Sequence, residues 1–95
     1  MNWPERLKIG AHTYELRFAD SWPLCEGELG EVDYESEVIY IKTGLSESAA
    51  AQTVLHEILH VMNAKLDHTL LESLAEQLTQ VLMDNGLLHH EKGDN

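Results

Sequence analysis

Hydrophobic and polar residues alternate near the start of the chain in two short runs, residues 7–9 and 13–18, on either side of a Gly-Ala-His segment. Alternation with a period of two is typical of a strand with one buried face. The two runs therefore predict a β-hairpin. Its buried face is expected to carry Tyr14, Leu16 and Phe18.

A second pair of runs, residues 30–35 and 38–42, is separated by a Ser-Glu dipeptide. Apolar and acidic residues alternate in the first run, whereas the second is continuously rich in β-branched and aromatic residues. A continuous run of this kind indicates a strand nearer the middle of a sheet. We expect a second hairpin here, joined to the first by a loop over residues 20–27 in which Trp22 covers the core.

Apolar residues then recur every three or four positions from residue 47 to about Lys65, which is the spacing of an amphipathic helix. Ser46 is a suitable N-cap for this helix. The same spacing predicts a second helix that ends near Asn85 and Gly86. Its apolar positions are Leu70, Leu71, Leu74, Leu78, Val81 and Leu82.

These elements predict an α+β fold, with a small, mainly antiparallel N-terminal sheet of two hairpins followed by two packed helices. The chain has 95 residues, which is enough for one domain with one core. We expect that domain to span residues 1–88 and residues 89–95 to form a polar tail.

The first predicted helix contains His56-Glu57-Ile58-Leu59-His60, a His-Glu-x-x-His motif. Two histidines four residues apart on a helix point the same way and can bind one metal ion together. The glutamate between them is placed to accept a proton from a metal-bound water. Both histidines fall on the polar flank of the helix, away from its apolar stripe. The motif therefore predicts a zinc site with His56 and His60 as ligands and Glu57 as general base.

A catalytic zinc ion usually has three protein ligands, so a third must come from elsewhere in the chain. Glu72 lies beside the apolar stripe of the second helix, and an antiparallel helix pair would aim it at the two histidines. It is our predicted third ligand. His68 is the main rival, Glu76 lies nearly opposite the stripe, and Cys25 is a further alternative.

Charge and composition narrow the classes of partner. Six basic and seventeen acidic residues give a net charge of −11, which opposes binding to nucleic acid or to an anionic membrane. The chain contains a single cysteine and no run of about 18 apolar residues that could span a membrane. A cytoplasmic protein that acts on peptides or proteins is the expectation.

The chain also resembles the small zincin-like metallopeptidase domains of phages and bacterial genomes. The resemblance rests on the strand-rich first half, on Thr-Val-Leu-His-Glu-Ile-Leu-His, and on the Leu-Glu-Ser-Leu-Ala-Glu-Gln-Leu stretch that follows. It implies a minimal gluzincin-type fold, although larger gluzincins place the ligand glutamate farther from the second histidine. The roles it implies are zinc ligand for His56, His60 and Glu72, and general base for Glu57.

The leading hypothesis is therefore zinc-dependent hydrolysis of peptide bonds. A regulatory or binding module that keeps the zinc site without turnover is the alternative. A metal-dependent RNase is opposed by both the charge and the histidine spacing. No residue matches a transition-state stabiliser of the family, and Tyr34, Tyr40 and His68 are the open choices.

Overall fold

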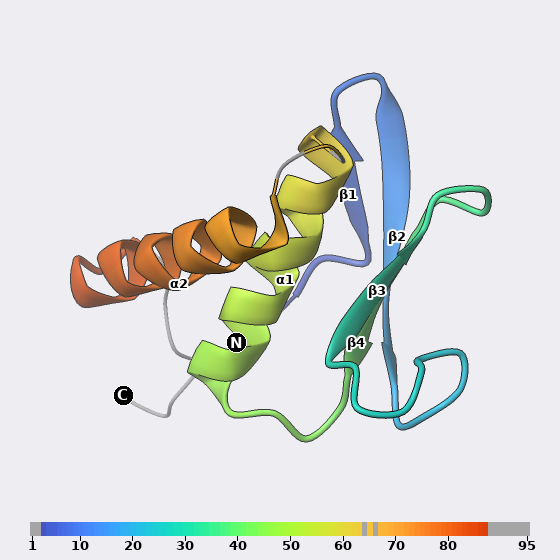
Figure 1. Ribbon diagram of the computed structural model, residues 1–95, viewed down its shortest axis with the longest axis horizontal. Helices are drawn as coiled ribbons and strands as arrows, with labels where there is room; N and C mark the ends of the chain where they lie inside the picture. The colour runs from blue at the N-terminus through green and yellow to red at the C-terminus, as the bar shows by residue number, and fades with distance from the viewer. Residues whose placement is uncertain (1–2, 64, 66, 88–95) are drawn as a thin grey trace.

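The computed structural model describes residues 3–63, 65 and 67–87. It confirms the α+β class, with a four-stranded, mostly antiparallel sheet followed by two helices (Figure 1). The predicted polar tail at residues 89–95 lies outside the described residues. The elements are β1 (Arg6–Ile9), β2 (His12–Ala19), β3 (Gly30–Asp33), β4 (Val38–Lys42), α1 (Glu47–Met62) and α2 (His68–Asp84).

The two predicted hairpins are β1–β2 and β3–β4, and they join through β2 and β4, which run parallel. The strand order is β1-β2-β4-β3, so β4 is internal, as its continuous apolar run predicted. This order leaves β3 at one edge of the sheet. The first strand of the second hairpin ends at Asp33 rather than at residue 35. Asp33 Oδ1 accepts the amides of Glu35 and Ser36 (both 3.1 Å), and these bonds start the turn.

One face of the sheet packs against α1, which lies between the sheet and α2 (Figure 1). The cluster of buried residues in this layer is Tyr14, Leu16, Ile39, Ile41 and Val54. Two aromatic predictions were wrong. Phe18, expected in the core, is 41% exposed, and Trp22, expected to cover the core, is 86% exposed.

Helix α1 begins where the sequence predicted. The Ser46 side chain accepts a hydrogen bond from the amide of Ala49 (3.2 Å), which satisfies one of the free N–H groups of the first turn. The helix ends at Met62 rather than near Lys65, since Asn63 takes an extended conformation.

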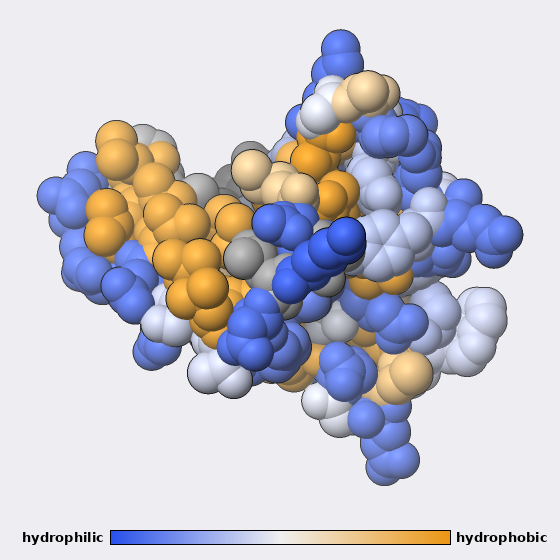
Figure 2. All heavy atoms as spheres, turned by 45° about the horizontal axis from the view of Figure 1, so that its top comes forward, coloured by the Kyte–Doolittle hydropathy of each residue, from blue (hydrophilic) through white to orange (hydrophobic). Residues whose placement is uncertain are grey.

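Helix α2 crosses α1 obliquely instead of lying antiparallel to it (Figure 1). Its buried residues are Leu71, Ala75 and Thr79, so the small side chains at the last two positions allow a close approach to α1. The predicted apolar stripe is therefore turned largely outward, and Figure 2 shows it as a continuous apolar band along α2. Its exposed members are Leu70, Leu74, Leu78 and Val81.

No helix among the described residues is long and apolar enough to cross a membrane.

The burial of α2 predicts a sharp difference between two neighbouring leucines. Leu71 is fully buried and Leu74 is 37% exposed. We expect Leu71→Ala to lower the free energy of unfolding by about 2–5 kcal/mol, because it leaves a cavity between the helices. Leu74→Ala, the matched control, should cost less than about 1 kcal/mol. Urea unfolding followed by circular dichroism measures both, and equal losses would contradict this orientation of α2.

Candidate active site

His56 and His60 lie one turn apart on α1, with both rings half-buried on the side that α2 crosses. Their Nε2 atoms are 3.1 Å apart, and their ring centroids are 4.8 Å apart. The helix alone accounts for this pairing, because positions four residues apart share one face. The two nitrogens are thus brought together as the motif predicted.

A third histidine reaches them from α2. His68 is the first residue of that helix, and its ring centroid lies 5.0 Å from that of His56 and 5.8 Å from that of His60. One nitrogen from each ring lies within 4.8 Å of the other two. We refer to His56, His60 and His68 as the three-histidine cluster. Among the described residues, these three side chains are the group whose spacing suits a bound metal ion.

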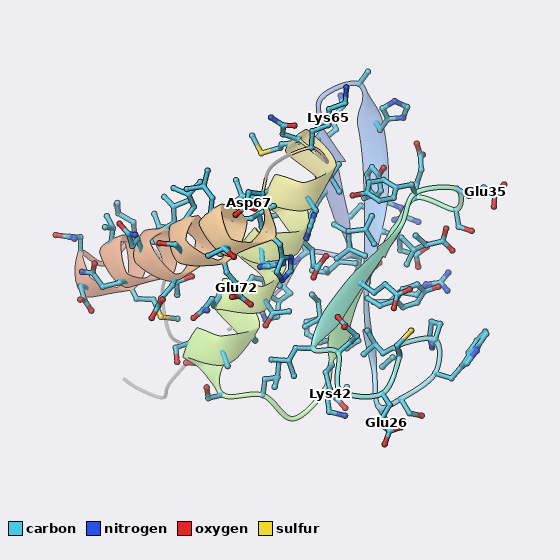
Figure 3. All side chains as sticks on the ribbon, in the orientation of Figure 1. Glu26, Glu35, Lys42, Lys65, Asp67 and Glu72 are labelled. Carbon is cyan, nitrogen blue, oxygen red and sulfur yellow. The ribbon has the colours of Figure 1, made fainter. Side chains whose placement is uncertain are left out.

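Glu72, the predicted third ligand, lies beside this cluster but is not part of it. It is one turn beyond His68, and its Oε2 atom is 3.7 Å from His68 Nε2. Figure 3 shows Glu72 near the crossing of the two helices. The oblique crossing explains the difference, because it brings the first turn of α2 closest to the α1 histidines. Glu76 and Cys25 are both exposed, and neither joins the cluster.

Burial and the charges of neighbouring histidines lower the pKa values of the α1 histidines and so favour their neutral form. Desolvation lowers the pKa of His56, and the charges of His60 and His68 lower it further, while Glu72 acts in the opposite direction. Desolvation, followed by the charge of His68, lowers the pKa of His60. Neutral imidazole is the form that binds a metal, so both rings are ready to act as ligands near neutral pH.

Glu57 is buried between the two histidines of the motif, with an exposed fraction of 6%. Among the described residues its carboxyl group has no hydrogen-bond or ion-pair partner. Desolvation raises its pKa to about 7, with further contributions from the charges of Glu28 and Glu31. A buried carboxyl group without a partner is costly, and such groups concentrate where they serve a function.

Gly30 allows this burial, a role that was not predicted from the sequence. A Cβ atom at Gly30 would lie 2.8 Å from Thr53 Cγ2 and 2.9 Å from Glu57 Oε2. The backbone of β3 therefore rests directly on the side chain of Glu57. A glycine at the first position of an otherwise β-branched and acidic strand was the available signal, since it marks a close approach of another group.

Two open cavities meet at Glu57. One, of about 320 Å³, is lined by residues that include Glu28, His68 and Glu72. The other, of about 220 Å³, extends along β3 past Glu31 and Tyr34 to His60. Gly30, His56 and Glu57 line both. The His-Glu-x-x-His motif therefore faces space in which a ligand could bind.

Tyr34 is the best placed of the residues considered as transition-state stabilisers. It lines the second cavity, and its hydroxyl donates to the carbonyl oxygen of His60 (3.3 Å). Desolvation, then the charge of Glu57, raises the pKa of Tyr34. Tyr40 instead interacts with Arg17 and lines neither cavity.

The residues of the site suit a divalent transition metal. Three imidazoles within reach of one another form a donor set used for zinc, copper, iron and nickel. A buried carboxyl group beside them can exchange a proton without binding the metal. The site suits such a metal because its three donors are imidazole nitrogens and lie within 4.8 Å of one another.

Comparisons of the chain with protein-family models, with curated proteins and with solved structures find no match.

The raised pKa of Glu57 predicts that this residue destabilises the metal-free protein at high pH. Folding favours the protonated carboxyl group, so its contribution to stability is greatest below about pH 4.5 and is lost as the pH rises to about 7. Glu57→Gln should therefore raise the free energy of unfolding by about 2–3 kcal/mol at about pH 8, and by much less at about pH 5. Urea unfolding with a chelator present measures both values. A gain that does not change with pH, or an equal gain from Glu35→Gln, would contradict this account.

Proposed function

We propose that this chain is a small zinc-dependent peptidase in which His56, His60 and His68 hold the metal and Glu57 is the general base. The observation that carries the proposal is the buried Glu57 side chain, which has no partner among the described residues and lines two cavities beside the three-histidine cluster. The sequence resemblance to zincin-like metallopeptidases supports the same reaction.

His68 is the third ligand in this proposal, in place of Glu72. Its ring lies within reach of both α1 histidines, whereas Glu72 lies next to His68 on the rim of the cavity. A carboxylate at this position can orient a ligand histidine and favour the bound cation. When bound, zinc supplies Lewis acidity toward a substrate carbonyl and toward water.

Glu57 would then take one proton from the attacking water at a carboxylate oxygen and return it to the leaving amine. Its position supports this role in two ways. The helix fixes it between His56 and His60, and no described group competes for its oxygens. Tyr34, which lines the second cavity, is the group that would donate to developing negative charge on the substrate.

The edge strand β3 offers the substrate a main-chain template. The amide of Lys42 donates to the carbonyl oxygen of Leu29 (2.8 Å), and hydrogen-bonded positions alternate along an antiparallel pair. Gly30 and Val32 therefore direct their main-chain groups away from β4, toward the open edge. An extended peptide bound to them would pass Glu57, because Gly30 touches that side chain.

Zinc affinity distinguishes His68 from Glu72 as the third ligand. We expect the untagged protein to bind about one zinc ion per chain, and His68→Ala to weaken zinc binding by a factor of about 100 or more because one of three ligands is lost. Glu72→Ala should weaken it by only about tenfold, as expected for a group that supports a ligand. Competition with a chromophoric chelator measures these affinities. The reverse order would identify Glu72 as the ligand, and absence of zinc binding by the wild type would refute the site.

Loss of the general base should abolish turnover and leave the metal in place. We expect Glu57→Gln to lower kcat for peptide hydrolysis by a factor of about 100 to 10,000 with zinc affinity unchanged. Release of new amino termini from an unstructured protein substrate measures this activity, and Glu35→Gln, in the β3–β4 turn, is the control. A biological activity that survives Glu57→Gln would favour the alternative of a binding module.

A further inference from the structure

Among the described residues that line the cavities around Glu57, three more carry a carboxylate and none is a lysine or an arginine. We call Glu28, Glu31 and Glu72 the acidic rim. Glu28 lines both cavities, Glu31 lines the one along β3, and Glu72 lines the one below α2. The site thus carries a local excess of negative charge within a chain that is acidic throughout.

Two members of the rim, Glu28 and Glu31, are not neutralised by a described cation, and the one described ion-pair partner of Glu72 is His68. Among the described residues neither Glu28 nor Glu31 has an ion-pair or side-chain hydrogen-bond partner. Lys42 shares a neighbouring cavity with Glu28, but its Nζ donates to the carbonyl oxygen of Asp20 (2.9 Å). A divalent ion would offset two of the charges of the rim and of Glu57, which still leaves the site negative. The rim therefore attracts a cationic group from outside the chain.

Glu57 independently indicates that a ligand belongs here. The residue is more than nine-tenths buried, its side chain has no partner among the described residues, and it lines both cavities that the rim borders. Gly30 lies against it, two residues after Glu28 and one before Glu31. A peptide extended along β3 would thus carry its side chains past the rim as its backbone passes Glu57.

We infer that the site selects peptides with an arginine or lysine side chain close to the scissile bond, and that Glu28 is the main specificity-determining residue. The inference rests on the proposed peptidase function and adds the class of substrate. Glu28 is the member of the rim that borders both cavities and the entrance to β3. A guanidinium group can bind a carboxylate through two parallel hydrogen bonds, so arginine is the preferred side chain.

Binding to the Glu57→Gln variant tests the inference without requiring turnover. The probes are two fluorescent octapeptides with either two central arginines or two central citrullines, which keep the shape and lose the charge. With zinc bound, the arginine peptide should bind about tenfold more tightly, and high salt should reduce this ratio. Adding Glu28→Gln to the variant should reduce the ratio to about two. Adding Glu35→Gln should leave it unchanged, because Glu35 points away from the site (Figure 3).

Equal binding of the two peptides, or an unchanged ratio after Glu28→Gln, would overturn the inference. Hydrolysis of the same peptides by the zinc-loaded wild type separates this failure from that of the proposed function. Cleavage of both peptides with equal kcat/KM would refute the preference and leave the peptidase standing. Preferential binding of the arginine peptide without cleavage would refute the peptidase and leave a site for basic peptides.

Discussion

The contact between Gly30 of β3 and the side chain of Glu57 on α1 brings the edge of the sheet against the His-Glu-x-x-His motif. A carboxyl group is costly to bury, and this one is covered by the backbone of an edge strand on one side and by its own helix on the other. The cost is offset by the core beneath it, where Ile39 and Ile41 of β4 are fully removed from solvent and pack near Val54 of α1. The helix is therefore held against the sheet by apolar contacts, and Glu57 is buried as a consequence. No described group bonds to the carboxyl oxygens of Glu57, so a ligand in the adjoining cavities could reach them.

The second constraint is the close approach of α2 to α1. Leu71, Ala75 and Thr79 form the contact, and Thr79 satisfies its own hydroxyl by donating to the carbonyl oxygen of Ala75 (2.8 Å). Small residues at a helix crossing fix where the helices touch, and here they bring the first turn of α2 to the histidines of α1. Asp67 caps that turn by accepting the amide of Leu70 (3.1 Å), which holds His68 at the helix start. The position of His68 thus follows from packing farther along the same helix.

Local signals in the sequence predicted the two hairpins, the Ser46 cap, the pairing of His56 with His60 and the internal position of β4. Each of these depends on residues close together in the chain or on the periodicity of one element. The third member of the histidine cluster depends on a crossing angle, which the apolar stripe of α2 did not reveal because most of that stripe faces solvent. A leucine-rich face suggested an antiparallel pair and therefore Glu72, whereas the contact is made by Ala75 and Thr79. The role of Gly30 was also hidden, since only the fold brings it to Glu57.

The topology of the sheet explains why Glu28 lies close to the edge strand β3. Because β4 is parallel to β2 and antiparallel to β3, β3 starts at the end of the sheet where β2 finishes. Residues 20–29 therefore stay at that end and cross past β4 to reach the edge of the sheet. That connection enters β3 at Gly30, and its residue Glu28 lines both cavities. With β4 internal, β3 has one neighbouring strand among the described residues, and its other side is an edge of the sheet at which a further strand could pair. The connection therefore brings the carboxylate of Glu28 next to the edge strand, so a peptide bound as proposed would meet main-chain hydrogen-bonding groups and negative charge at the same place.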